Sequence, residues 1–251
     1  MNIAIVCYPT FGGSGVVATE LGIELSKNGH KIHFVTYSQP VRLEALNAKL
    51  NFHEVNVPRY SLFKFQPYEL ALSSRLVDVV KENNIEILHV HYAIPHASCA
   101  LLAKEILKTM GIEIPVITTL HGTDITLIGA DPSCEPVINY SINNSDGVTA
   151  VSNSLKLETL NLFDINQEID VIPNFIDHSI FKKSEKNIYR ERFCKNGEKL
   201  IIHTSNFRKV KRIQDVVNIF CKIKKTIPAK LIMIGDGPER AIIEALSRSL
   251  C

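Results

Sequence analysis

The chain has 251 residues, of which 45% are apolar and 22% are charged, a balance typical of folded globular proteins rather than disordered or fibrous ones. Its 28 basic and 26 acidic residues leave a net charge of only +2, which is too small for a general attraction to nucleic acid or anionic lipid. The sequence shows no signal-peptide pattern and no apolar run of about 20 residues, the length that crosses a bilayer. We therefore expect a cytoplasmic protein whose partners are small molecules, with no nucleic acid and no membrane.

Strand-length apolar runs alternate with helical patterns along the first two thirds of the chain. Strands that are apolar on both faces and separated by helices are typical of a parallel sheet covered on both sides. The pattern therefore predicts an α/β fold, with one Rossmann-like domain over residues 1–172. Its predicted strands are 3–7, 32–37, 52–57, 85–91, 115–120, 147–151 and 169–172, and its predicted helices are 16–27, 68–82, 96–109, 135–143 and 153–162.

A second unit follows a segment rich in charge and turn formers, residues 173–198, which we interpret as a connection. Residues 199–251 contain a strand at 200–205, a helix at 213–225, a strand at 229–235 and a final helix. Two parallel strands bury too little apolar surface to be stable alone. We expect this unit to be the start of a second, incomplete Rossmann-like domain.

A glycine turn, Gly13-Ser14-Gly15, lies between the first predicted strand and the first predicted helix. Such a turn presents free backbone N–H groups and the positive end of a helix dipole, which together favour an anion. The spacing Gly13-x-Gly15-x-x-Ala18 also matches a dinucleotide fingerprint. The second strand ends without the acidic residue that binds a ribose, although Arg42 could take a 2′-phosphate. An NAD(P)-dependent oxidoreductase is therefore the alternative from a different class.

Histidines gather at the ends of the fourth and fifth predicted strands. His89 and His91 share one strand face, and with His96 and His121 they raise the alternative of a metal hydrolase. No further ligands occur at a recognisable spacing, so we predict no metal and no cofactor. His121 follows a strand, at the edge of a doubly wound sheet where ligands bind.

In the second unit, Asn206 and a basic run, residues 208–212, follow the strand 200–205 directly. A solvated basic run is the simplest interpretation. Cations at such a turn also suit a diphosphate whose negative charge grows as a bond breaks.

Five short motifs, taken in chain order, resemble the retaining glycosyltransferases with two facing Rossmann-like domains, the glycosyltransferase type B architecture. Within that group, the sequence over His91–Ala97 and Ser205–Arg212 resembles that of the branch that acts in bacillithiol biosynthesis. The resemblance covers the whole chain. The motifs are Gly12-Gly13-Ser14-Gly15, His89-Val90-His91-Tyr92, His121-Gly122-Thr123-Asp124, Val171-Ile172-Pro173-Asn174 and Gly235-Asp236-Gly237-Pro238-Glu239.

The resemblance implies that N-acetylglucosamine is transferred from UDP-N-acetylglucosamine to L-malate with retention at the anomeric carbon, and it implies no metal. An N-terminal domain would bind the acceptor and a C-terminal domain the nucleotide sugar. A retaining glycosyltransferase with another small acceptor, or a binder of sugar nucleotides without activity, remains an alternative. The chain would be compatible with a homo-oligomer.

The residue roles implied by the resemblance fall into three groups. His121, which would contact the donor sugar, and Lys211, which would stabilise the departing UDP, are the implied catalytic residues. Either Arg59 or Lys64 could pair with a malate carboxylate. The implied donor-binding residues are Gly15, Asn206, Arg208 and Lys211, and the implied acceptor-binding residues are Gly13, Ser14, Tyr92 and Thr119.

Two departures from the family pattern affect the donor site. Asn206 stands where many relatives have arginine, so Lys211 and Arg208 would meet more of the phosphate charge. The family's pair of glutamates that grips the donor lies later than Cys251. We therefore expect the 251-residue chain to bind donor poorly and to turn over slowly.

Overall fold

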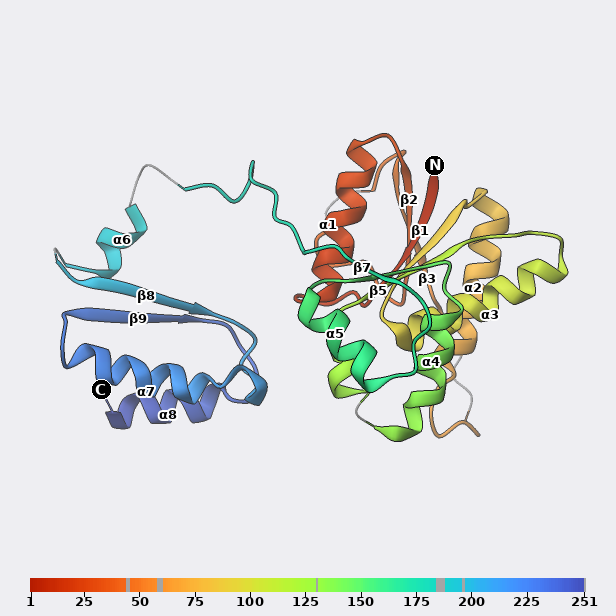
Figure 1. The fold of residues 1–251 in the computed structure, drawn as a ribbon. Helices are drawn as coiled ribbons and strands as arrows, with labels where there is room; N and C mark the ends of the chain where they lie inside the picture. The colour runs from red at the N-terminus through yellow and green to blue at the C-terminus, as the bar shows by residue number, and fades with distance from the viewer. Residues whose placement is uncertain (44–45, 58–60, 130, 184–187, 196, 251) are drawn as a thin grey trace. The chain divides into compact units, whose positions relative to one another are not determined.

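The computed structural model describes residues 1–43, 46–57, 61–129, 131–183, 188–195 and 197–250. The chain forms two compact units, Met1–Phe175 and Ile176–Cys251 (Figure 1). The first unit ends three residues after the domain boundary expected from the sequence. No helix in the described ranges is long and apolar enough to cross a membrane.

The first unit is built on one sheet of seven strands in the order β3-β2-β1-β4-β5-β6-β7, and every neighbouring pair is parallel. The strand order reverses between β1 and β4, as in doubly wound folds that bind ligands at this point. The strands are β1 Asn2–Val6, β2 Lys31–Thr36, β3 Leu50–Glu54, β4 Ile87–His91, β5 Val116–Leu120, β6 Gly147–Ala150 and β7 Ile169–Val171.

Helices cover both faces of this sheet (Figure 1). Alternate residues of β1 point to opposite faces, and Ile3 and Ile5 pack with Ala18 of α1. Ala4 and Val6 belong instead to the core formed with α2 and α3. The helices are α1 Ser14–Lys27, α2 Tyr68–Asn83, α3 Ser98–Thr109, α4 Glu135–Asn143 and α5 Asn153–Leu162.

The predicted elements differ from the structure mainly at their ends. The strand expected at 52–57 is Leu50–Glu54, and the one expected at 85–91 begins at Ile87. The helix expected at 96–109 is preceded by an irregular turn, Ala93–Ala97, in which Ile94 has extended backbone, so that α3 begins at Ser98. A π-helical turn, Thr123–Leu127, follows β5. Both turns follow a strand at the ligand-binding edge, where tertiary contacts determine the backbone.

The second unit contains a parallel pair of strands, β8 Lys199–Thr204 and β9 Ala229–Ile234. Helices α7 Ile213–Lys224 and α8 Arg240–Leu250 contribute Ile213, Val217 and Ile243 to a small core with Phe207. The segment expected to be only a connection contains a short helix, α6 Ile188–Phe193. Lys230 on β9 donates a hydrogen bond to the carbonyl of Phe193 at 2.7 Å, which ties this helix to the strand pair.

Candidate functional site

Three loops of the first unit meet at the carboxyl edge of its sheet. β1 pairs with β4, and β4 pairs with β5, all in parallel. The residues that follow these strands therefore lie side by side, and they are the glycine turn after β1, Tyr92 after β4 and His121 after β5. A hydrogen bond between Ser14 and Tyr92 and a ring contact between Tyr92 and His121 support this arrangement.

The glycine turn has a backbone shape that only glycine tolerates well. Gly13 has φ +63° and ψ −135° and precedes the first residue of α1. A Cβ atom on Gly15 would lie 2.2 Å from the carbonyl oxygen of Tyr8 and 3.0 Å from the backbone nitrogen of Thr10. The start of α1 thus packs directly on the chain that leaves β1.

The N-terminus of α1 has no side-chain cap. Its first intrahelical hydrogen bond runs from the amide of Val17 to the carbonyl of Gly13. The amides before Val17 therefore lack helical partners, and the helix dipole adds partial positive charge. This end of α1 is suited to bind a carboxylate or a phosphate.

Ser14 and Tyr92 join the glycine turn to the end of β4. The Ser14 hydroxyl donates a hydrogen bond to the Tyr92 hydroxyl at 2.8 Å, and both side chains are buried. Tyr92 has φ +91°, which is rare for a bulky residue and usually marks a constrained functional position. Its ring lies 5.5 Å from that of His121 and 5.4 Å from that of Tyr8. Three residues expected at the site are thus in contact, together with Tyr8, which was not predicted for the site although it lies just beyond β1.

Two stacked histidines, His89 and His91, pack against His121. The rings of His89 and His91 are stacked 4.8 Å apart, and those of His91 and His121 are 5.0 Å apart. Nδ1 of His91 lies 2.7 Å from Nε2 of His121. Burial lowers the pKa of His89 and of His121 to about 4, so both rings are neutral near pH 7. His121 therefore acts as a neutral hydrogen-bonding group.

Thr119, expected at the acceptor site, lies within the polar layer on β5. Its hydroxyl is 2.8 Å from Nε2 of His89 and 2.8 Å from the hydroxyl of Thr149 on β6. Two of its three hydrogen-bonding positions are thus engaged by the protein. The described residues contain no group of three or more His, Cys, Asp or Glu side chains arranged to bind a metal ion.

Asp124 is a buried carboxylate that holds two loops of the site together. Its carboxylate accepts hydrogen bonds from the backbone amides of Ala93 at 3.0 Å, Gly122 at 3.0 Å and His121 at 3.2 Å. Burial raises the pKa of Asp124, while these amide hydrogen bonds oppose the shift. The side chain joins the loop after β4 to the loop after β5. The motif His121-Gly122-Thr123-Asp124 was visible in the sequence, but its contact with Ala93 was not.

The second unit presents its own polar turn. Three residues after β8 have exposed side chains, namely Asn206, Arg208 and Lys211. The backbone amide of Lys211 closes a 3₁₀ turn by donating a hydrogen bond to the carbonyl of Arg208 at 2.8 Å. Phe207 donates its amide to the carbonyl of Asp236 at 2.8 Å, so the turn after β9 supports this segment. The expected donor-binding cations of this unit therefore share one turn.

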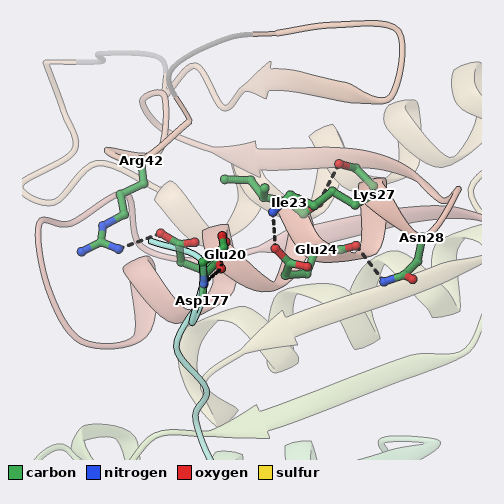
Figure 2. A network of polar contacts seen from close by, with 9 residues as sticks. Glu20, Ile23, Glu24, Lys27, Asn28, Arg42 and Asp177 are labelled. Carbon is green, nitrogen blue, oxygen red and sulfur yellow. Dashed lines mark hydrogen bonds and ion pairs between the residues drawn. The ribbon is translucent and has the colours of Figure 1, made fainter. Parts of the chain in front are cut away.

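Arg42 is engaged elsewhere, which weakens the dinucleotide interpretation. Its guanidinium donates to the carboxylate of Glu20 on α1 at 2.7 Å, as Figure 2 shows beside the hydrogen bond from Asn28 to the carbonyl of Glu24.

Of the two basic residues considered for malate, Lys64 has its Nζ 5.5 Å from the centre of the ring of Phe65. Arg59 lies outside the described residues.

Comparisons with known proteins match most or all of the chain. The model of Glycosyltransferase Family 4 matches residues 11–180. The chain is 50% identical over its full length to N-acetyl-alpha-D-glucosaminyl L-malate synthase of Bacillus anthracis, and it spans 65% of that relative's length. It resembles the structure of sucrose-phosphate synthase from Thermosynechococcus elongatus, with 14% identity and a TM-score of 0.75 over 100% of this chain and 68% of that one. It also resembles Anabaena HepE in complex with UDP and glucose, with 16% identity and a TM-score of 0.72 over 99% and 65% of the two chains. The two structural similarities concern the fold alone, and they confirm the predicted α/β class.

Proposed function

The chain belongs to glycosyltransferase family 4, and from this premise we propose that it forms the acceptor site and part of the donor site of an N-acetylglucosaminyltransferase. The donor is UDP-N-acetylglucosamine, the acceptor is L-malate, and the anomeric configuration is retained. The product would be the first intermediate of bacillithiol biosynthesis. The 50% identity to the Bacillus anthracis synthase over all 251 residues supports these substrates.

The N-terminus of α1 supports L-malate as the acceptor. The uncapped amides at the start of α1 would bind one malate carboxylate. The Ser14–Tyr92 pair lies beside them and offers hydroxyl groups that are already oriented by their mutual hydrogen bond. A preorganised site of this kind binds a small ligand without the entropy cost of ordering long side chains. The malate hydroxyl would then be the nucleophile.

The turn after β8 supports a nucleotide diphosphate as the leaving group. Lys211 and Arg208 are exposed cations on one short turn. As the bond between the sugar and the diphosphate breaks, negative charge accumulates on UDP, and these cations would stabilise it. His121 is neutral near pH 7 because its pKa is about 4, so it would hydrogen-bond the sugar without adding charge.

The uncapped N-terminus of α1 beside the Ser14–Tyr92 pair is the observation that carries this proposal. The test is to incubate the protein, expressed with its complete reading frame, with UDP-N-acetylglucosamine and L-malate, and to identify the products by mass spectrometry. We expect N-acetylglucosaminyl malate and UDP in equal amounts, and no product when malate is omitted. UDP release without the glycoside, or a glycoside formed only with another acceptor, would contradict the assignment of malate.

A further inference from the structure

His91 is a fully buried histidine whose ring contacts the site residue His121. The side chain is 1% exposed and stacks between the rings of His89 and His121. Its Nδ1 lies 2.7 Å from Nε2 of His121. Within the described part of the chain, its Nε2 is buried and has no hydrogen-bond partner. One nitrogen of His91 is thus paired and the other is not.

These contacts decide which nitrogen of His91 carries the proton. Burial and three neighbouring histidines lower its pKa well below the usual value, so the ring is neutral and has a single N–H. A proton on Nε2 would be a buried N–H group without an acceptor, and such groups are rare in folded proteins. A proton on Nδ1 donates directly to His121. The second arrangement satisfies the donor.

The state of His91 fixes the state of His121. When Nε2 of His121 accepts the bond from His91, the single proton of the neutral His121 ring must be on Nδ1. Among the described residues, none hydrogen-bonds to that Nδ1 atom, and the side chain is half-buried beside Tyr92. His121 then offers an N–H donor rather than a lone pair.

We propose that His91 is a positioning residue that holds His121 in the Nδ1–H tautomer, so that His121 donates a hydrogen bond to an oxygen of the bound substrate. The part about substrate rests on the proposed function, and the part about the tautomer does not. A hydroxyl or ring oxygen of the sugar fits this donor, whereas another N–H or ammonium group does not. The backbone supports the geometry, because Nδ1 of His96 donates to the carbonyl oxygen of His91 at 2.5 Å.

Long-range ¹H–¹⁵N correlation spectra of the ¹⁵N-histidine-labelled 251-residue chain test the tautomer directly. The spectra distinguish protonated from unprotonated ring nitrogens, and single variants of His91 and His121 assign the signals. His178→Asn, at an exposed histidine outside the stack, is the matched control for assignment. We expect protonated Nδ1 and unprotonated Nε2 on both His91 and His121. An unprotonated Nδ1 on His121 would overturn the inference.

Two substitutions at His91 separate donation from packing. Asparagine places an N–H donor near the position of Nδ1, whereas leucine fills similar volume without a donor. We expect His91→Asn to keep the His121 tautomer and to retain kcat within about 3-fold, and His91→Leu to mix the tautomers and lower kcat roughly 10-fold at unchanged malate KM. Equal kcat values for the two variants would refute the positioning role. The expected tautomer in a protein that makes no glycoside would contradict only the proposed function.

Discussion

Replacing Gly15 with alanine should disrupt the proposed acceptor site by a backbone collision. The added Cβ would lie 2.2 Å from the carbonyl oxygen of Tyr8, whereas real Cβ contacts essentially never fall below 3.0 Å. The start of α1 must therefore move by about 0.8 Å, and the obstacle is backbone, which cannot rotate away as a side chain can. Overpacking of this kind lowers the free energy of unfolding by about 1–3 kcal/mol. The shift also misaligns the amides proposed to bind malate, and loss of one hydrogen bond to a charged group weakens binding roughly 10- to 100-fold.

Gly12→Ala is the matched control in the same turn, because nothing lies within 4 Å of the position that its Cβ would take and its φ is not positive. Urea denaturation of both variants measures stability, and isothermal titration calorimetry with L-malate measures affinity. We expect Gly12→Ala to match the wild type in both and Gly15→Ala to fall in both. Wild-type stability and affinity in Gly15→Ala would show that the close packing of Gly15 on Tyr8 does not shape the site.

Three further predictions follow from single contacts. Ser14→Ala and Tyr92→Phe remove opposite ends of one buried hydrogen bond, so a double-mutant cycle measured by urea denaturation should give a coupling energy of about 1 kcal/mol. Strictly additive losses in the free energy of unfolding would show that this hydrogen bond does not contribute to stability. Burial lowers the pKa of His96 to about 4, so between pH 6.5 and 4 the unfolded chain binds a proton that the folded chain does not. Stability should therefore be full above pH 6.5 and fall by about 1.4 kcal/mol per unit for this group as the pH decreases, and His96→Asn should flatten the slope in pH-dependent urea melts. Lys211→Met should lower kcat about 100- to 1000-fold with malate affinity unchanged, whereas Lys224→Met on an exposed part of α7 should change neither, and equal kcat values for the two would exclude Lys211 from leaving-group stabilisation.

Much of the parallel sheet could be predicted from the sequence because its strands carry a local signal. β1 is apolar on both faces, and β4 carries the apolar pair Leu88 and Val90 on one face, and this pattern reflects burial between two helical layers. The position of His121 at the ligand-binding edge follows from the same topology, since it comes directly after β5. These predictions needed only the order and polarity of neighbouring residues.

The features that could not be predicted depend on contacts between loops distant in sequence. Asp124 accepts a hydrogen bond from the backbone amide of Ala93, 31 residues earlier, and no local pattern specifies that partner. The irregular turn Ala93–Ala97 replaces the helix start expected from apolar spacing. The positive φ of Tyr92 likewise has no sequence signal, because bulky residues rarely adopt a positive φ and a local pattern would not predict one. Such features arise where tertiary contacts override local preference, which is common at functional sites.

Glycine performs the same physical task in both units. In the first, the missing Cβ of Gly15 lets α1 begin against the carbonyl of Tyr8. In the second, a Cβ on Gly235 would lie 1.9 Å from the carbonyl of Ser205, so the turn after β9 packs on the end of β8. In each case close backbone packing fixes a polar turn beyond a parallel strand, and the charge that the turn offers comes from amides in one unit and from cations such as Lys211 in the other. Amides suit a small carboxylate of fixed shape, and exposed cationic side chains suit a diphosphate whose charge grows during reaction. The difference in chemistry between the two turns is therefore the physical argument for proposing that the first unit binds the acceptor and the second stabilises the leaving group.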